Sequence, residues 1–483
     1  MTTDINVLKL EDYDIDEKRG FLSSEMPPSA LPHEYYAPWE KIATNIPQLL
    51  LTSQMKNVVE NELPLLSIDQ LSTLPELKRA YVLLTFMING YVWSSTPPNE
   101  CVPEALAQPL LQVSEKLGLP PIATYSSVVL WNYKIVDPSK PLDLENLTTG
   151  LTFTGSIDES WFYLISVYFE KVGARCIEHG LKAINAVNNA DSAQFINSMK
   201  QLAQGIDDLT EILTRMDEKC DPYVFYFRIR PFLAGWKNMA KAGLPNGVKY
   251  GSEGGYQQWA GGSNAQSSLI QYLDLVLGVT HFTDAGQEKY PRKPIANESQ
   301  YKRNDYLLNM REYMPGPHRS FLKTINETTN IRQFVLSQAE DTDVRLAYDT
   351  CISMLKNFRD VHLDTIIRKY IMIPAAAERM QQSNTMRQGL ANTHDAKPKE
   401  QVGTGGTSLL KFLTQCRDET SDMAVTKWVK EYLKDGTADS ANRELNFIFD
   451  YNFNFMGFKD KTVNIQHAED DENGDVDFFI HHW

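Results

Sequence analysis

Cysteine is scarce in this chain, and its pattern is informative. The 483 residues contain five cysteines, spaced far apart, with no CxxC pair: Cys101, Cys176, Cys220, Cys351 and Cys416. A disulfide framework needs an even set of cysteines and a zinc site needs closely spaced pairs. We therefore expect reduced thiols and a cytoplasmic location.

Long apolar runs and basic stretches are also missing. The longest apolar run without charge, residues 80–93, is shorter than the roughly 20 residues that a membrane helix requires. The first 20 residues are polar and acidic, unlike a signal peptide. The net charge is −15, with an acidic cluster at residues 469–477. An acidic chain without a basic stripe argues against nucleic acid and anionic membranes as partners.

What the sequence does contain is apolar residues at helical spacing. Hydrophobic residues make up 42% of the chain, enough for a large core, and there are no repeats or clear alternating strands. These features predict an all-α protein. Ser67 and Gln70 resemble a capping box ahead of a helix that Pro75 opens, and Pro231 predicts a kink in a later helix. Periodicity leaves residues 126–133 open between helix and strand.

Composition divides the chain into four parts. A Pro-, Thr- and Gly-rich stretch at 137–155 is the expected boundary between two helical domains. We predict a polar N-terminal arm at 1–35, a small helical domain at 36–150, a large helical domain at 151–435 and a C-terminal extension with an acidic tail at 436–483.

One histidine stands on a strongly apolar helix, predicted over residues 352–373. Leu355, Phe358, His362 and Ile366 recur at spacings of three and four, so His362 points into a core. A buried imidazole is either hydrogen-bonded within the protein or bound to a metal, and the first case is the commoner one. Arg359 on a nearby face suits a haem, whose iron takes histidine and whose propionates take arginine.

Two aromatic stretches are candidate binding walls. In WFYLISVYFE at 161–170, Phe162, Tyr163 and Ser166 share a face that could line a pocket for a flat apolar ligand. The alternative is a serine bonded to its own helix. In YVFYFRIR at 223–230, Tyr226 and Arg230 share a face, and the planar guanidinium of Arg230 could bind a substrate carboxylate through two hydrogen bonds. The alternative is a surface ion pair.

Glycine-rich and histidine-containing loops complete the candidates. AGGS at 260–263 and GTGGT at 403–407 match no phosphate-binding motif, and close backbone approach to a ligand fits them better. His318, in the Pro-Gly-Pro-His stretch, is a second candidate ligand or, by preference, a loop residue.

A series of motifs together resembles the indoleamine 2,3-dioxygenase family over roughly residues 30–430. They occur in the family's order: LGLPPIATY at 117–125, WFYLIS at 161–166, FYFRIRPFLAGW at 225–236, AGGSNAQSS at 260–268, YMPGPHRSFL at 313–322, RDVHLDTIIRKYIMIPA at 359–375 and GTGGT at 403–407. The resemblance implies two helical domains, the larger C-terminal one holding haem b between helices. The long C-terminal region is similar to that of fungal members.

The resemblance also implies roles for individual residues. His362 matches the proximal iron ligand, and Arg359 and Asp274 match positions near the haem propionates. Arg230 matches the arginine that binds the tryptophan carboxylate, with Phe225 beside it. The positions that match the distal pocket and the loops closing over substrate are Tyr125, Phe162, Tyr163, Ser166, Tyr226, Gly261, Gly262, Ser263, Asn264 and Thr404. Two of these depart from the family: Asn264 stands where alanine is usual, and Tyr226 replaces a phenylalanine.

The activity implied is oxidation of L-tryptophan by O2 to N-formyl-L-kynurenine, the first step of the kynurenine route towards NAD. The catalytic set is Ser166, Arg230 and Phe225, with Ser166 as a positioning group rather than a nucleophile. The expected partners are L-tryptophan, O2 and an external reductant, and the expected state is a monomer. The alternatives are a catalytically weak O2-binding haem protein on the same fold, and a helical scaffold without cofactor.

Overall fold

Helices form most of the described chain, as the all-α prediction expects. The computed structural model describes residues 8–281, 305–375 and 409–435. The contacts among residues 1–434 define one compact unit, and a second unit begins at Asp435. The division of the helical region near residue 150 remains a prediction.

The elements before residue 150 are mostly short helices. In chain order they are η2 (Leu10–Tyr13), η3 (Glu34–Tyr36), α1 (Ala37–Thr44), α2 (Ile46–Leu51), α3 (Met55–Asn61), α4 (Leu74–Val92), β1 (Cys101–Val102), α5 (Glu104–Leu117), η4 (Ser126–Leu130), β2 (Tyr133–Ile135), η5 (Leu144–Asn146) and β3 (Leu147–Thr149). The open question at 126–133 is thus resolved as a helical turn followed by the start of a strand.

Longer helices follow. They and their connecting elements are α6 (Ile157–Val172), α7 (Ala174–Asn188), α8 (Ser192–Thr214), η6 (Arg215–Glu218), α9 (Pro222–Val224), η7 (Phe225–Ile229), α10 (Arg230–Leu233), η8 (Ala240–Ala242), β4 (Val248–Tyr250), β5 (Tyr256–Gln257), η9 (Asn264–Gln266), α11 (Ser268–Leu277), α12 (Asp305–Met310), η11 (Arg311–Tyr313), α13 (Gly316–Thr328), α14 (Ile331–Ser337), α15 (Thr342–Val361), η12 (His362–Met372), α17 (Leu409–Ser421) and α18 (Lys427–Asp435).

Local side-chain chemistry sets where several helices begin. Thr73 and Glu76 form the capping box of α4, which places the box six residues after the predicted one at Ser67. The prediction was wrong because the cap must directly precede the first helical residue, here Leu74. Ser156 caps α6 and Asp341 caps α15 in the same way, each accepting a hydrogen bond from a first-turn N–H.

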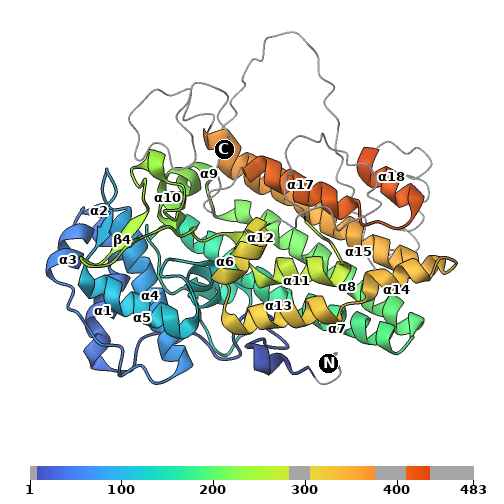
Figure 1. Ribbon diagram of the computed structural model, residues 1–483, viewed down its shortest axis with the longest axis horizontal. Coiled ribbons are helices and arrows are strands. Elements are labelled where there is room, and N and C mark those ends of the chain that lie inside the picture. Colours follow the sequence, from blue (N-terminus) through green and yellow to red (C-terminus); the bar gives the residue numbers. More distant parts are fainter. Residues whose placement is uncertain (1–7, 282–304, 376–408, 436–483) are drawn as a thin grey trace, which may run out of the picture. The chain divides into compact units, whose positions relative to one another are not determined.

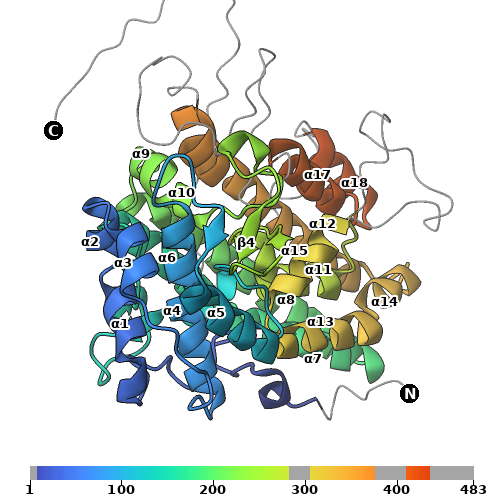
Figure 2. The ribbon, with the colours of Figure 1, turned by 60° about the vertical axis from the view of Figure 1, so that its left-hand side comes forward.

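The core of the C-terminal half is a layer of antiparallel and crossing helices. α8 packs against α7 and α15, and α15 also packs against α17 (Figure 1). In the N-terminal half, α4 is flanked by α1 and α5 (Figure 2). α4 is buried along almost its whole length, from Lys78 to Val92. It therefore acts as the central helix of its half.

The strands among the described residues are two or three residues long and join distant segments. β4 pairs in parallel with β1 and antiparallel with β5, while β2 pairs antiparallel with β3. The β1–β4 pairing ties the segment after Arg230 to the loop that precedes α5.

The described part of the N-terminal arm packs onto the helices. Phe21 is buried, and its ring meets His318 edge-on at 4.9 Å between centroids. Lys78 on α4 donates to Asp14 at 2.6 Å. His318 itself lies in α13 and is buried, not in a loop, so the preferred sequence interpretation of this residue was wrong.

Three segments among the described residues widen into π-helix: η4, η7 and η12. The kink predicted at Pro231 takes this form, because η7 ends at Ile229 and α10 restarts at Arg230. Proline lacks the N–H that would bond to the carbonyl of Phe227. The predicted helix at 352–373 likewise begins as α15 and becomes π-helical at His362. π-Helical turns are frequent at functional sites.

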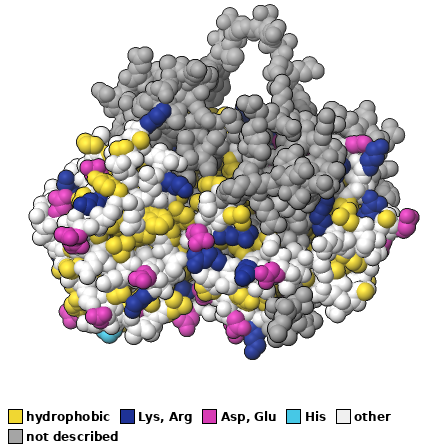
Figure 3. Space-filling model, in the orientation of Figure 1, with side chains coloured by type: hydrophobic (Ala, Val, Ile, Leu, Met, Phe, Trp, Pro, Cys, Tyr) yellow, Lys and Arg dark blue, Asp and Glu magenta, His cyan; other side chains and the backbone are white. Residues whose placement is uncertain are grey.

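The described surface has no single-sign field on the face shown in Figure 3, where acidic and basic side chains are interspersed. None of the helices within residues 8–281, 305–375 and 409–435 combines the length and apolar character needed to cross a membrane.

Asn89 of α4 joins the two halves, and its replacement tests this junction. Its Nδ2 donates to the Phe232 carbonyl at 2.8 Å, and its Oδ1 accepts from the Ala123 N–H at 3.2 Å. Asn89→Leu keeps the volume but removes both bonds, so we expect a loss of about 2–4 kcal/mol in urea unfolding. Asn61→Leu, at an exposed position, is the control. Equal effects of the two variants would contradict the role of Asn89.

Candidate active site

One face of α6 forms a wall of the candidate site. Phe162 and Ser166 lie one turn apart on this helix, and the Phe162 ring is only partly buried. The Ser166 hydroxyl donates to the carbonyl of Phe162 at 3.4 Å, so it bonds back to its own helix. Tyr163 is fully buried, and its hydroxyl donates to Glu159 at 2.9 Å.

Aromatic contacts bring α6, η7 and the His362 helix together. The rings of Phe162 and Phe225 are 4.6 Å apart, and Phe225 meets Tyr370 of η12 edge-on at 5.9 Å. Phe169, further along α6, contacts Phe358 of α15 at 5.7 Å. Since Phe358 and Tyr370 lie on either side of His362 in the sequence, these contacts hold the helix that carries the histidine against α6 and η7.

The His362 imidazole is held in an unusual state for a histidine inside a protein. Among the described residues it has no hydrogen-bond partner for either ring nitrogen. The surrounding protein and, secondarily, Arg359 lower its pKa to about 4, so the ring is neutral. Its side chain nevertheless keeps intermediate accessible surface, so a ligand could reach the ring. A neutral, accessible imidazole with no partner among the described residues fits a metal ligand better than a satisfied core residue.

Three residues before His362, Arg359 enters a buried ion network. Its Nη2 donates to both oxygens of Asp274 on α11, at 2.6 and 2.8 Å, and its Nη1 donates to Thr420 of α17. Burial alone would raise the pKa of Asp274, but Arg359 and His281 hold it below its usual value. The two predicted propionate-edge residues are thus partners of each other.

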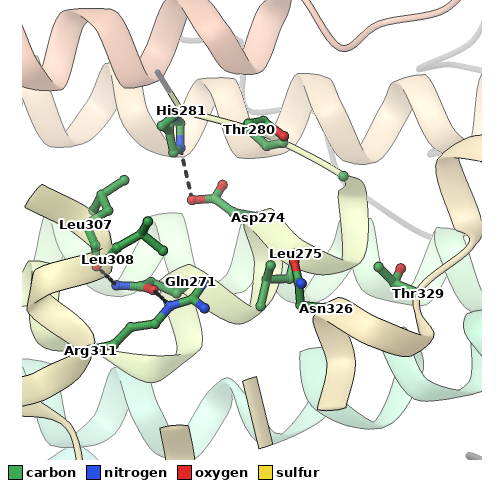
Figure 4. A pocket seen from close by; sticks show the side chains of 12 residues that line it. Gln271, Asp274, Leu275, Thr280, His281, Leu307, Leu308, Arg311, Asn326 and Thr329 are labelled. Atoms are coloured by element: carbon green, nitrogen blue, oxygen red, sulfur yellow. Dashed lines mark hydrogen bonds and ion pairs between the residues drawn. The ribbon is translucent and has the colours of Figure 1, made fainter. Parts of the chain in front are cut away.

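His281 extends this network. Its Nε2 lies 3.1 Å from Asp274 and its Nδ1 lies 2.7 Å from Glu419 of α17 (Figure 4 shows the first contact). Burial would lower the pKa of His281, but Cys416 and Asp274 raise it well above its usual value, so the ring is a cation. Two buried cations and two buried carboxylates therefore join α11, α15 and α17.

Arg230, the first residue of α10, is buried, with 5% of its surface exposed. Its guanidinium sits 5.6 Å from the centre of the Tyr226 ring, as a cation–π pair. A surface ion pair, the alternative left open by the sequence, does not describe this residue. Arg228, two positions earlier, is exposed.

The loop before α11 passes close to the segment after Arg230. The N–H groups of Trp236 and Lys237 donate to the Trp259 carbonyl at 2.9 and 3.0 Å. A Cβ on Gly235 would lie 2.3 Å from the Gly261 nitrogen, and a Cβ on Gly261 would lie 2.1 Å from the Leu233 carbonyl oxygen. Both glycines are required by this backbone crossing.

A separate pocket of about 150 Å³ opens beside the ion network (Figure 4). Gln271, Asp274, His281 and Arg311 line it, but none of the candidate aromatic residues does. It is therefore separate from the aromatic contacts among α6, η7 and η12.

The structure describes the surroundings of most of the residues predicted from the sequence, and their joint role as one site stays a prediction. Those whose neighbourhood is now defined are Tyr125, Phe162, Tyr163, Ser166, Phe225, Tyr226, Arg230, Gly261, Gly262, Asp274, Arg359 and His362. Ser263 caps η9, and the Asn264 side chain is exposed. Thr404 and the GTGGT stretch lie outside the described residues. Sequence analysis missed His281, Glu419 and Glu170, because their partners are far away along the chain.

Comparison with known proteins places this architecture in a family. The model of the family described as "Indoleamine 2,3-dioxygenase" matches residues 9–423. Because this match covers most of the chain, the protein belongs to the indoleamine 2,3-dioxygenase family, a family of dioxygenase enzymes.

Individual relatives agree with this assignment. The chain is 44% identical over 430 residues to an indoleamine 2,3-dioxygenase of Saccharomyces cerevisiae, covering 85% of this chain and 92% of the relative. It is 34% identical over 422 residues to human indoleamine 2,3-dioxygenase 2, covering 86% and 95%. A 6-hydroxytryptophan 2,3-dioxygenase of Fusarium equiseti is 35% identical over 412 residues, covering 85% and 96%.

The ion network predicts a large cost for Asp274→Asn. The change leaves Arg359 and His281 buried without their shared carboxylate, so we expect unfolding in urea to lose about 3–5 kcal/mol. Asp360→Asn is the matched control, because Lys356 and Arg417 contact Asp360 at a partly exposed site. It should lose less than about 1 kcal/mol. Similar losses for both variants would show that the network does not stabilise the fold.

Proposed function

We propose that this protein is a haem-dependent dioxygenase that converts L-tryptophan and O2 to N-formyl-L-kynurenine. The single observation that carries the proposal is His362, a neutral and partly accessible imidazole without a partner among the described residues, on a helix that packs against aromatic rings of α6 and η7. Membership of the indoleamine 2,3-dioxygenase family supports the same reaction.

The residues present fit haem b. His362 would hold the iron, since the ligand form of histidine is the neutral one. Arg359, with Asp274, would face the propionate edge, as a guanidinium suits carboxylates. When bound, the haem supplies the redox chemistry with O2, after an external reductant has made its iron ferrous. The protein would supply substrate binding, orientation and the exclusion of water.

The substrate side is assigned to α6 and η7. The rings of Phe162 and Phe225 offer apolar faces for the indole and exclude water from it. The buried guanidinium of Arg230 would take the substrate carboxylate, where low polarity strengthens the pair. Tyr125, Tyr226, Gly262, Ser263, Asn264 and Thr404 complete the proposed substrate site, with Tyr163 behind Phe162.

No side chain of this set is required as a base. Both oxygen atoms of O2 enter the product while the indole C2–C3 bond breaks. The protein therefore needs to orient the substrate and to exclude water. Ser166 is suited to tuning polarity, because its hydroxyl is already bonded to the carbonyl of Phe162.

The alternative of a weak O2-binding protein is not favoured. The relatives that match most of the chain are named dioxygenases, and a store for O2 has no use for a buried carboxylate clamp at Arg230. Cytoplasmic location remains part of the proposal, supported by five free cysteines. The monomeric state and the reductant are likewise proposed, not tested.

The proposal is tested by giving the reduced, haem-supplemented protein O2 and L-tryptophan and identifying the product by chromatography and mass. We expect N-formyl-L-kynurenine. Because one relative is named for 6-hydroxytryptophan, the same assay is run with that indole as a competitor. A preference for it would redirect the substrate assignment, and no product from either indole would refute the activity.

His362→Ala should lose bound haem. Removing the imidazole removes the proposed iron ligand, so the Soret absorbance per protein after haem supplementation should fall severalfold and turnover should disappear. His33→Ala, at an exposed position, is the control. Full haem occupancy with normal turnover in the His362 variant would mean that another residue holds the iron.

Arg230→Met should raise KM for L-tryptophan while haem stays bound. Loss of one buried charge-assisted pair corresponds to roughly 10- to 100-fold in KM. Arg228→Met changes an exposed arginine two residues away and should leave KM near its original value. If both variants show the same KM, Arg230 is not the carboxylate clamp.

A further inference from the structure

Glu170 is a fully buried carboxyl group on the same helix as Ser166, one turn further along. Its Oε1 accepts two hydrogen bonds, from the Tyr125 hydroxyl at 2.9 Å and from the Ser267 hydroxyl at 2.6 Å. Its Oε2 is buried and has no hydrogen-bond partner among the described residues. The carboxyl therefore joins three segments while using only one of its oxygens.

The two donors belong to segments that border the proposed substrate site. Tyr125 directly precedes η4, and Ser267 directly precedes α11. Gln266 strengthens the junction, because its Oε1 accepts from the Tyr125 N–H at 2.9 Å and its Nε2 donates to the Gly261 carbonyl at 2.8 Å. The whole stretch 261–267 is thus fastened to α6 through Glu170 and Tyr125.

The charge environment makes this junction responsive to protons. Burial raises the pKa of Glu170 to about 7, although Ser267 and Tyr125 partly oppose the shift. Burial and Glu170 raise the pKa of Tyr125 well above its usual value, so the phenol stays a donor at neutral pH. Tyr125 is the titratable group that faces the carboxyl from the η4 side. α11 contributes the uncharged Ser267, and no described cation pairs with Glu170.

We propose that Glu170 is a positioning residue that fixes the 261–267 segment over the substrate site, and that its protonation state sets how tightly this segment is held. As a carboxylate, it accepts both hydroxyl protons in charge-assisted bonds, which are about twice as strong as neutral ones. As a neutral acid, it accepts them more weakly, and its own proton finds no acceptor at Oε2. The effect on substrate binding rests on the proposed function, whereas the effect on the segment does not.

The sign of the pH dependence follows from this chemistry. Raising the pH through about 7 ionises Glu170 and tightens the segment. The same ionisation costs global stability, because a folded-state pKa above the unfolded value favours the protonated form. That contribution is complete below the unfolded pKa and is lost as pH rises to about 7. A more tightly held 261–267 segment, together with a small loss of global stability, distinguishes a positioning role for Glu170 from a role in packing alone.

The test is backbone hydrogen exchange of residues 261–267 in the purified full chain, measured by mass spectrometry from about pH 6 to about pH 8 and corrected for intrinsic rates. In the wild type we expect protection to rise about fivefold across this range, which corresponds to the free energy of about one neutral hydrogen bond. Glu170→Gln keeps the shape and should abolish this rise. Glu159→Gln, a buried glutamate on the same helix that anchors residues 153–154, should retain it.

Ser267→Ala provides a second, milder variant that removes one donor and should reduce the rise in protection. If the proposed activity holds, KM for L-tryptophan should fall over the same pH range in the wild type and not in Glu170→Gln, with kcat little changed. A rise in protection that persists in both Glu170→Gln and Ser267→Ala, or its absence in the wild type, would overturn the proposal. The expected rise in protection without any turnover of L-tryptophan would count against the proposed function alone.

Discussion

The arrangement depends on one neutral imidazole, that of His362, which has no hydrogen-bond partner among the described residues. A polar group that is partly removed from water without gaining a partner costs free energy. The fold sustains it with aromatic contacts on either side, Phe358 with Phe169 and Tyr370 with Phe225. On the proposed function, this position leaves His362 available to bind the haem iron.

The departures from regular α-helix serve the same end. η4, η7 and η12 begin at or beside Tyr125, Phe225 and His362, so each candidate wall includes a widened turn. A π-turn shifts side chains out of the ordinary helical register. Pro231 enforces one such turn, since it removes a backbone donor just after Arg230. Site geometry is therefore encoded in backbone irregularity as well as in side-chain identity.

Much of this could be predicted from sequence, because apolar spacing dictates which helix face is buried. The inward position of His362 and the kink near Pro231 both follow from periodicity or local backbone chemistry. The His281–Glu419 and Glu170–Ser267 contacts could not be predicted in this way, since they join residues 138 and 97 positions apart. The capping box failed for a different reason: the pattern at Ser67 exists, but the helix begins after Thr73.

The central claim is that this helical site inserts both atoms of O2 into L-tryptophan. It is tested most directly by supplying isotopically labelled O2 to the reduced, haem-supplemented protein with L-tryptophan and weighing the product at early times. We expect N-formyl-L-kynurenine in which both new oxygen atoms carry the label. A product with only one labelled oxygen, or binding of O2 with no product at all, would contradict the account.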